Sequence, residues 1–192
     1  MQPAEFDSIV EAAQAGAEWA WFRLHTELAG LVLGYLRSRG AAEPEDLLSE
    51  VFVQVARNIG SFAGDARSFR SWVFTVAHHR LIDEQRYRSR RPVTPTEIAE
   101  ESAGSGDVEQ EALDAIGTDR VLALLDDLTP DQHSVLLLRI IGDQTIDEIA
   151  RILGKRPGAV KALQRRAFDA LRRTLDGTGR TPSATIDGNG IV

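Results

Sequence analysis

Apolar side chains recur every three or four residues along nearly the whole chain, the spacing that places them on one face of an α-helix. The clearest series is Trp19, Phe22, Leu28, Leu31 and Leu36. No segment alternates apolar and polar residues for long enough to require a β-strand. The pattern therefore predicts an all-α protein. The chain also has no cysteine, which excludes a disulfide scaffold, a cysteine nucleophile and a thiolate metal site.

Glycine and proline divide this helical pattern into two small domains. In the first, helices are expected from Trp19 to just before Gly40, from Pro44 to near Gly60 and from Phe69 to Arg90, with a loop over 61–68. A stretch rich in Pro, Gly and acidic residues follows, and it predicts a flexible linker. The expected division is an N-terminal extension (1–14), a first helical domain (15–91), an acidic linker (92–117), a second helical domain (118–175) and a disordered tail (176–192).

Charge is distributed very unevenly along the chain. The net charge is −7, yet residues 67–91 carry +5 and residues 155–173 carry +6, while residues 92–119 carry −8. Salt screens exposed charges beyond about 8–10 Å, so the local charge decides what each surface attracts. Two basic segments on either side of an acidic one indicate two contacts with a polyanion. The alternative is that both are ordinary solvated helix faces.

The second domain carries the helix start and stop signals of a helix-turn-helix. Thr129 with Gln132, and Thr145 with Glu148, each form the sequence pattern of a capping box at a helix start. Gly154 follows the second of these helices, and a third is expected to begin beside Pro157. Such a last helix enters the major groove of DNA, although a three-helix bundle with a basic solvated face is the alternative. The polar side chains on and beside it are Lys155, Arg156, Lys161, Gln164, Arg165 and Arg172.

Several motifs in a fixed order resemble one protein family. The run Asp46-Leu47-Leu48-Ser49-Glu50-Val51-Phe52 resembles region 2.2 of bacterial sigma factors, and 69–74 with 77–83 resembles their regions 2.3 and 2.4. The segments 128–130, 136–139, 146–150, 153–154 and 158–161 resemble region 4. Together they resemble the extracytoplasmic-function (group 4) subfamily of sigma-70 factors, with region 2 at 15–91 and region 4 at 118–175.

The resemblance implies a subunit of the transcription machinery and not an enzyme. Its expected partners are core RNA polymerase, through the β′ coiled coil and the β flap, then promoter DNA, and an anti-sigma factor. No cofactor or metal is expected, nor membrane insertion, and the expected location is the cytoplasm. The acidic linker is expected to thread through the active-site cleft of the polymerase; the alternative is a soluble spacer that the repulsion between its own charges keeps extended.

The resemblance also implies three groups of contact residues. Core polymerase would bind Asp46, Ser49, Glu50, Val53 and Gln54. The minus-ten element would be read and melted by Phe62, Gly64, Asp65, Phe69, Trp72, Val76, His79, Arg80, Asp83 and Arg86. The minus-thirty-five element would be read by the polar residues of the helix-turn-helix given above.

Two other classes of protein fit the sequence less well. An enzyme is disfavoured because His78 and His79 are adjacent and cannot both face one metal from a helix, and no phosphate-binding loop is present. A stand-alone helix-turn-helix regulator would explain the second domain. It would leave the arginine-rich helix that ends near Arg91 unexplained.

Overall fold

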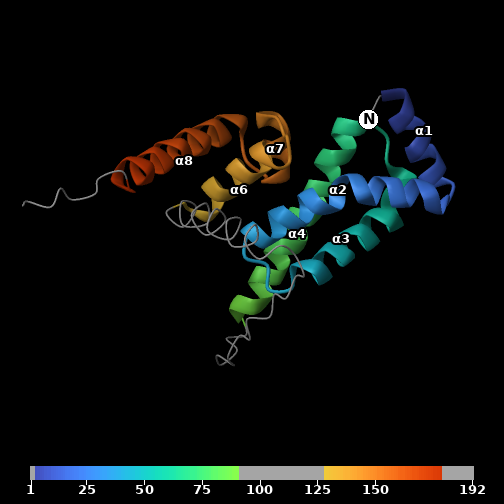
Figure 1. Ribbon diagram of the computed structural model, residues 1–192, viewed down its shortest axis with the longest axis horizontal. Coiled ribbons are helices and arrows are strands. Elements are labelled where there is room, and N and C mark those ends of the chain that lie inside the picture. The colour runs from blue at the N-terminus through green and yellow to red at the C-terminus, as the bar shows by residue number, and fades with distance from the viewer. Residues whose placement is uncertain (1–2, 91–127, 179–192) are drawn as a thin grey trace, which may run out of the picture.

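The computed structural model describes residues 3–90 and 128–178, and every regular element in these two ranges is a helix (Figure 1). The all-α prediction is therefore confirmed. The first module contains α1 (Pro3–Gln14), α2 (Glu18–Ser38), α3 (Pro44–Asn58), the 3₁₀ turn η1 (Ile59–Ser61) and α4 (Ala66–Arg90). The second contains α6 (Pro130–Ile140), α7 (Ile146–Ile152) and α8 (Pro157–Thr178). The linker 92–117, residues 118–127 and the tail beyond 178 lie outside the described residues.

The core of the first module forms where α2, α3 and α4 turn their apolar faces toward one another. Fully buried side chains include Leu24, Val32, Val51, Phe74 and Leu81. Burying each such side chain contributes about 1.5–3 kcal/mol, which far exceeds the contribution of helix propensity per residue. The helices are therefore held mainly by packing against one another.

Helix α1 is part of this core, although the sequence analysis set residues 1–14 apart as an extension. Its residues Phe6, Ile9, Val10 and Ala13 are buried, which is the i, i+3, i+4, i+7 pattern of an amphipathic helix. At its end, the side-chain amide of Gln14 donates to the backbone oxygens at 59 and 62, both at 2.9 Å. Helix α1 thereby ties down the loop that precedes α4.

Helix α4 begins at Ala66, three residues before the predicted start, so the loop is shorter than 61–68. The reason is a cap: the carboxylate of Asp65 accepts from the backbone N–H of Ser68 at 2.8 Å. Hydrogen bonds from the side chain and the backbone of Ser68 lower the pKa of Asp65. Gly64 precedes the cap. A Cβ there would lie 2.9 Å from Cβ of Ser68, so the tight turn requires glycine.

In the second module, the predicted capping boxes and the predicted role of Gly154 are confirmed. Both capping boxes form, with Thr129 and Gln132 at the start of α6 and Thr145 and Glu148 at the start of α7. Gly154 adopts φ +62° and ends α7, as a left-handed glycine commonly does. Helix α8 then continues to Thr178, beyond the predicted end at 175.

Within residues 3–90 and 128–178, none of the helices has the length and apolar character needed to cross a bilayer.

Candidate nucleic-acid interface

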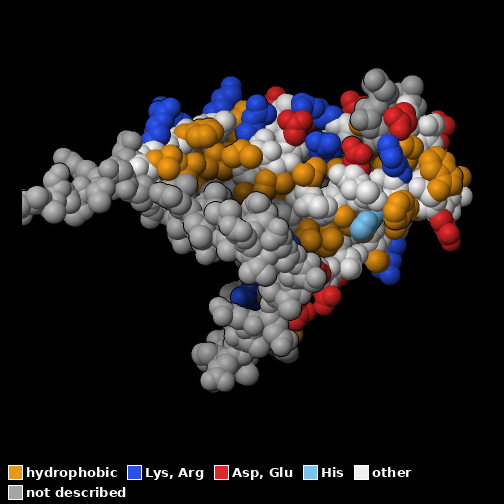
Figure 2. All heavy atoms as spheres, in the orientation of Figure 1, with side chains coloured by type: hydrophobic (Ala, Val, Ile, Leu, Met, Phe, Trp, Pro, Cys, Tyr) orange, Lys and Arg blue, Asp and Glu red, His pale blue; other side chains and the backbone are white. Residues whose placement is uncertain are grey.

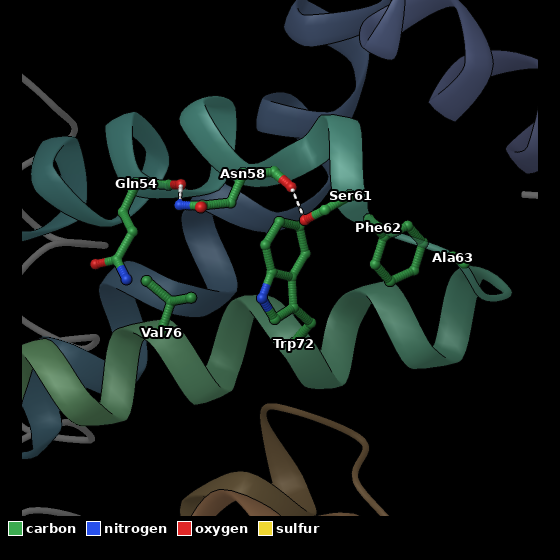
Figure 3. Close-up of a pocket in the computed structure, with 7 residues that line it drawn as sticks. All are labelled: Gln54, Asn58, Ser61, Phe62, Ala63, Trp72 and Val76. Carbon is green, nitrogen blue, oxygen red and sulfur yellow. Dashed lines mark hydrogen bonds between the residues drawn. The ribbon is translucent and has the colours of Figure 1, made fainter.

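A pocket of about 540 Å³ lies between the end of α3 and the first half of α4 (Figure 3). This volume falls within the range of roughly 300–1,000 Å³ that is typical of small-ligand sites. The rings of Phe62 and Trp72 stack beside it, with centroids 5.4 Å apart and planes inclined by 17°. They form a flat aromatic wall that suits a planar ligand. The lining residues are Gln54, Asn58, Ser61, Phe62, Ala63, Trp72 and Val76.

The opposite side of the pocket is polar. The side-chain oxygen of Gln54 accepts from Nε of Arg80 at 2.7 Å, and the side-chain amide of Asn58 donates to the backbone oxygen of Gln54 at 2.7 Å. Each amide thus uses one of its two polar atoms within the described part of the chain. The NH₂ group of Gln54 and the side-chain oxygen of Asn58 remain as a donor and an acceptor for a ligand.

Three of the residues predicted to contact the minus-ten element line this pocket, namely Phe62, Trp72 and Val76. Gly64 and Asp65 form the turn beside it and do not line it. The turn brings Phe62 back against α4, and this explains why a short loop and the helix after it share one site.

The prediction for Phe69 needs a correction. This side chain is 1% exposed and belongs to the core, where its ring packs edge-on against Phe62 and Trp72 at centroid distances of 5.1 and 5.7 Å. Phe69 therefore supports the aromatic wall from behind and does not face a ligand. Helical spacing placed it next to the pocket, but only the packing of α1, through Phe6, shows that it is covered.

The other predicted minus-ten residues continue along α4 toward its basic end. His79 is exposed. Arg80 lies between α3 and α4, where its guanidinium contacts Gln54 and approaches Glu50 Oε2 at 3.5 Å. Asp83 and Arg86 are exposed, and Nη1 of Arg86 lies 3.8 Å from Oδ1 of Asp83. Exposed ion pairs of this kind are weak, so Arg86 can exchange Asp83 for a phosphate at little cost.

The residues predicted to bind core polymerase divide into two sets. Asp46, Ser49, Glu50 and Val53 are exposed on the outer face of α3, and Val53 is 48% exposed despite being apolar. Gln54 does not share this face, because its side chain turns to Arg80 and the pocket. Gln54 lies about 40° around the helix from Glu50, on the side of α3 nearer α4, and Arg80 contacts both side chains.

The basic surface of the second module follows one side of α8. Lys161, Arg165 and Arg172 are exposed on one side of the helix, with about one turn between the first two and about two turns between the last two, and Gln164 is half-buried beside them. Arg156 is exposed just before the helix. In Figure 2, Lys and Arg side chains border α8 along its upper edge. Lys155 differs from the rest of the predicted set, because its Nζ contacts the carboxylate of Asp131 at 2.7 Å.

Several residues of these surfaces were not predicted from the sequence. Asn58, Ser61 and Ala63 line the pocket, and Phe168 is 41% exposed between the basic residues of α8. Gln54 and Asn58 are four residues apart at the end of a helix that precedes the aromatic loop, and this i, i+4 amide pair was a usable signal. Nothing in the local sequence distinguishes Phe168 from the core residues of α8.

Comparison with known proteins assigns both modules to one family. The family description "Sigma-70 region 2" matches residues 23–91, and "Sigma-70, region 4" matches residues 118–171. The ECF RNA polymerase sigma factor BldN of Streptomyces coelicolor is 33% identical over 180 residues, which cover 92% of this chain and 68% of BldN.

Solved structures share the fold. CnrH, solved in complex with the cytosolic domain of CnrY, superposes with a TM-score of 0.65 at 22% identity over 90% of this chain and 97% of CnrH. The sigma factor RpoE of Bartonella quintana, solved with the anti-sigma factor NepR, gives a TM-score of 0.61 at 18% identity over 80% of this chain and 95% of RpoE. Together with the matched regions and the identity to BldN, the two-module architecture shows that the chain belongs to the extracytoplasmic-function sigma factors, which bind core RNA polymerase and direct promoter-specific transcription initiation.

Proposed function

We propose that the pocket between α3 and α4 captures one flipped base of the minus-ten element while the DNA is being melted. Taking a base out of the stack costs a few kcal/mol, and stacking on an aromatic side chain returns about 1–3 kcal/mol per base. The Phe62–Trp72 wall supplies that stacking surface at the edge of a cavity of about 540 Å³. This pocket is the observation that carries the proposal.

The polar side of the pocket would choose the base. The NH₂ group of Gln54 and the side-chain oxygen of Asn58 offer one donor and one acceptor to the edge of the captured base. A base that presents the wrong pattern would leave a polar group unpaired, which costs about 1–3 kcal/mol. Farther along α4, His79, Arg80, Asp83 and Arg86 would follow the same strand toward its phosphates.

The outer face of α3 fits core polymerase. Asp46 and Glu50 provide negative charge, and Val53 provides exposed apolar surface next to it. A coiled coil that carries Arg would complement this combination. The second module would read the minus-thirty-five element, with Lys161, Gln164 and Arg165 in the major groove and Arg156 and Arg172 on phosphates.

The proposal extends to the location of the protein, its domains and its other partners. The chain would act in the cytoplasm as an initiation factor without catalytic groups, metal or cofactor. Its residues 15–91 and 118–175 would be the functional domains, and the acidic segment 92–117 would thread through the polymerase. An anti-sigma factor would bind it, since the RpoE neighbour was solved with one.

Reconstituted transcription tests the pocket. Asn58→Ala and Gln54→Ala should each slow open-complex formation by about 3- to 10-fold, because each removes one base contact. Their affinity for core polymerase should be unchanged, since neither residue lies on the outer face of α3. Arg57→Ala, an exposed neighbour on the same helix, is the matched control. Normal melting by both pocket variants would contradict the assignment.

The polymerase face has its own test. The double variant Asp46→Arg with Glu50→Gln should weaken co-elution with core polymerase about tenfold or more while helicity stays intact. Glutamine is chosen at 50 because arginine there would repel Arg80. Tight promoter-specific binding without polymerase would favour the stand-alone regulator instead.

A further inference from the structure

The first half of α2 exposes two aromatic side chains that the core does not use. Phe22 is 74% exposed, the highest value for a large apolar side chain in residues 3–90 and 128–178, and Trp19 is 60% exposed. In Figure 2, apolar side chains gather at the corner where α2 begins beside α1. Two large rings one helical turn apart form an apolar patch, and exposed patches of this kind mark sites of interaction with another molecule.

The same side of α2 is flat farther along the helix. Thr26 and Gly30 follow Trp19 and Phe22 at the spacing i, i+3, i+7 and i+11, which places all four on one side of the helix. A Cβ added at Gly30 or Gly34 meets no atom of the described residues within 4 Å, so the packing of this part of the chain does not require glycine at either position. Because glycine inside a helix is destabilising relative to alanine, two open glycines favour a role in contact with a partner.

The charges of α2 complement those of a second α2 helix that runs in the opposite direction. Its Glu and Arg residues are Glu18, Arg23, Glu27 and Arg37, and all four are exposed. An antiparallel pair of α2 helices centred near Thr26 sets Arg23 opposite Glu27 of the second copy and Glu18 opposite its Arg37. Each arginine also contacts an acid of its own chain, but these exposed pairs are weak and leave the guanidinium groups able to serve both.

The same antiparallel pairing brings the rings to the glycines. Phe22 faces Gly30 of the second copy, and Trp19 faces its Gly34. A contact between two identical chains related by a two-fold axis requires this exchange, in which residue i meets residue j and j meets i. Helix α2 is about 30 Å long. The exposed parts of two rings from each copy supply about half of the roughly 1,200 Å² at the lower end of standard protein interfaces.

We propose that this side of α2, called the α2 face and formed by Trp19, Phe22, Thr26 and Gly30, is the contact of a homodimer in which the two α2 helices pack antiparallel. The order of charges selects a second copy as the occupant, because a purely basic or purely acidic partner would repel half of the charges that flank the α2 face. The small area makes the dimer weak, with a Kd of about 10–100 μM. The pocket and the proposed polymerase face lie outside this contact, so the proposal does not depend on the proposed function.

Sedimentation equilibrium of the full-length chain measures the dimer, and two charge reversals test the pairing. Arg23→Glu leaves acids at both 23 and 27, and Glu27→Arg leaves cations at both, so each variant repels its own kind. When the two variants are mixed, the acids of one chain meet the cations of the other. Arg57→Glu, an exposed reversal on α3, is the matched charge control.

Two further variants test the apolar contact. Phe22→Ala removes an exposed ring. Gly30→Leu fills an open position with a residue that favours helix, so circular dichroism should show a fold at least as helical as the wild type. Both should dimerise about tenfold or more weakly, because one loses the ring and the other blocks the site that receives it. Ile140→Ala, at a position 69% exposed in the second module, is the matched apolar control.

The wild type and both controls should dimerise with the same Kd. Each charge reversal alone should dimerise about tenfold or more weakly, and the equimolar mixture should recover the wild-type Kd as a heterodimer. A wild-type chain that stays monomeric up to about 200 μM contradicts the dimer. Unchanged dimers in both charge variants, or a mixture that does not associate, contradict the antiparallel pairing. Wild-type association of Phe22→Ala and Gly30→Leu contradicts the role of the α2 face.

Discussion

At the scale of single residues, the buried position of His78 decides its protonation state. Its Nδ1 lies 2.8 Å from the hydroxyl of Tyr35 at the contact between the modules. Burial lowers the pKa of His78 to about 4, and the positive charges of His79, Arg39 and Lys155 act in the same direction against the smaller opposing effect of Asp131. Burial also raises the pKa of Tyr35. The neutral histidine is therefore the form that the fold accommodates.

This depressed pKa predicts acid sensitivity. Between pH 6.5 and 4 the unfolded chain protonates His78 and the folded chain does not, so stability is full above pH 6.5 and falls as the pH drops. From pH 7 to pH 5 the free energy of unfolding should fall by about 2 kcal/mol from this residue. His78→Gln should be less stable at pH 7 but should lose less on acidification. Urea unfolding at pH 7 and pH 5 measures the free energy of unfolding of the wild type and of His78→Gln. An equal loss of stability in the two proteins would contradict the buried neutral state of His78.

At the scale of elements, α1 should behave as part of the first module. Phe6→Ala removes a ring that is 1% exposed and packs 5.7 Å from the ring of Phe69, and it should cost about 3–5 kcal/mol. Asp7→Ala, on the exposed side of the same helix, should cost less than about 0.5 kcal/mol. Urea unfolding followed by circular dichroism compares the two. A cost below 1 kcal/mol for Phe6→Ala would show that α1 is only loosely attached.

The two capping boxes offer a second comparison between elements. Thr145 accepts from the backbone N–H of Glu148 and donates to its carboxylate at 2.7 Å, and Glu148 is buried. Thr129 caps α6 at an exposed position, where its hydroxyl accepts from the backbone N–H of Gln132 at 3.4 Å, close to the 3.3 Å of the equivalent contact at Thr145. Thr145→Ala should therefore cost about 1–2 kcal/mol and Thr129→Ala about half as much. Equal costs by thermal unfolding would mean that burial of Glu148 does not matter.

At the scale of the whole molecule, a net charge of −7 is combined with a local basic surface on α8. Each lost phosphate contact should reduce the salt dependence of promoter binding by the holoenzyme by about 0.9 in the slope of log K against log salt. Arg156→Ala and Arg172→Ala each remove one exposed cation that is proposed to contact phosphate. Lys155→Ala is the informative control, because Lys155 already contacts Asp131 and should change the slope little. Identical slopes for all three variants would mean that the recognition surface is misassigned.

Much of this protein could be predicted from its sequence. The two capping boxes, the glycine at 154 and the helical periodicity are local signals, and the structure forms each of them where the sequence predicts. The order of sigma-70 motifs likewise identified the family without any structure. The pocket was predicted only in part, because Asn58 and Ser61 belong to it as much as Phe62 does.

The sequence by itself determined most of the helices and both capping boxes, because these depend on side chains within four residues of each other, and the order of its motifs determined the family. It did not determine that α1 joins the core or that α4 begins at Ala66. Tertiary structure decided which side of each helix is covered: it placed Gln54 in the pocket, buried Phe69 behind the aromatic wall and set Asp143 against Arg67. The physical reason is that these contacts join segments far apart in the chain, and helical spacing fixes the angle of a side chain about its own helix but not the neighbour that it meets.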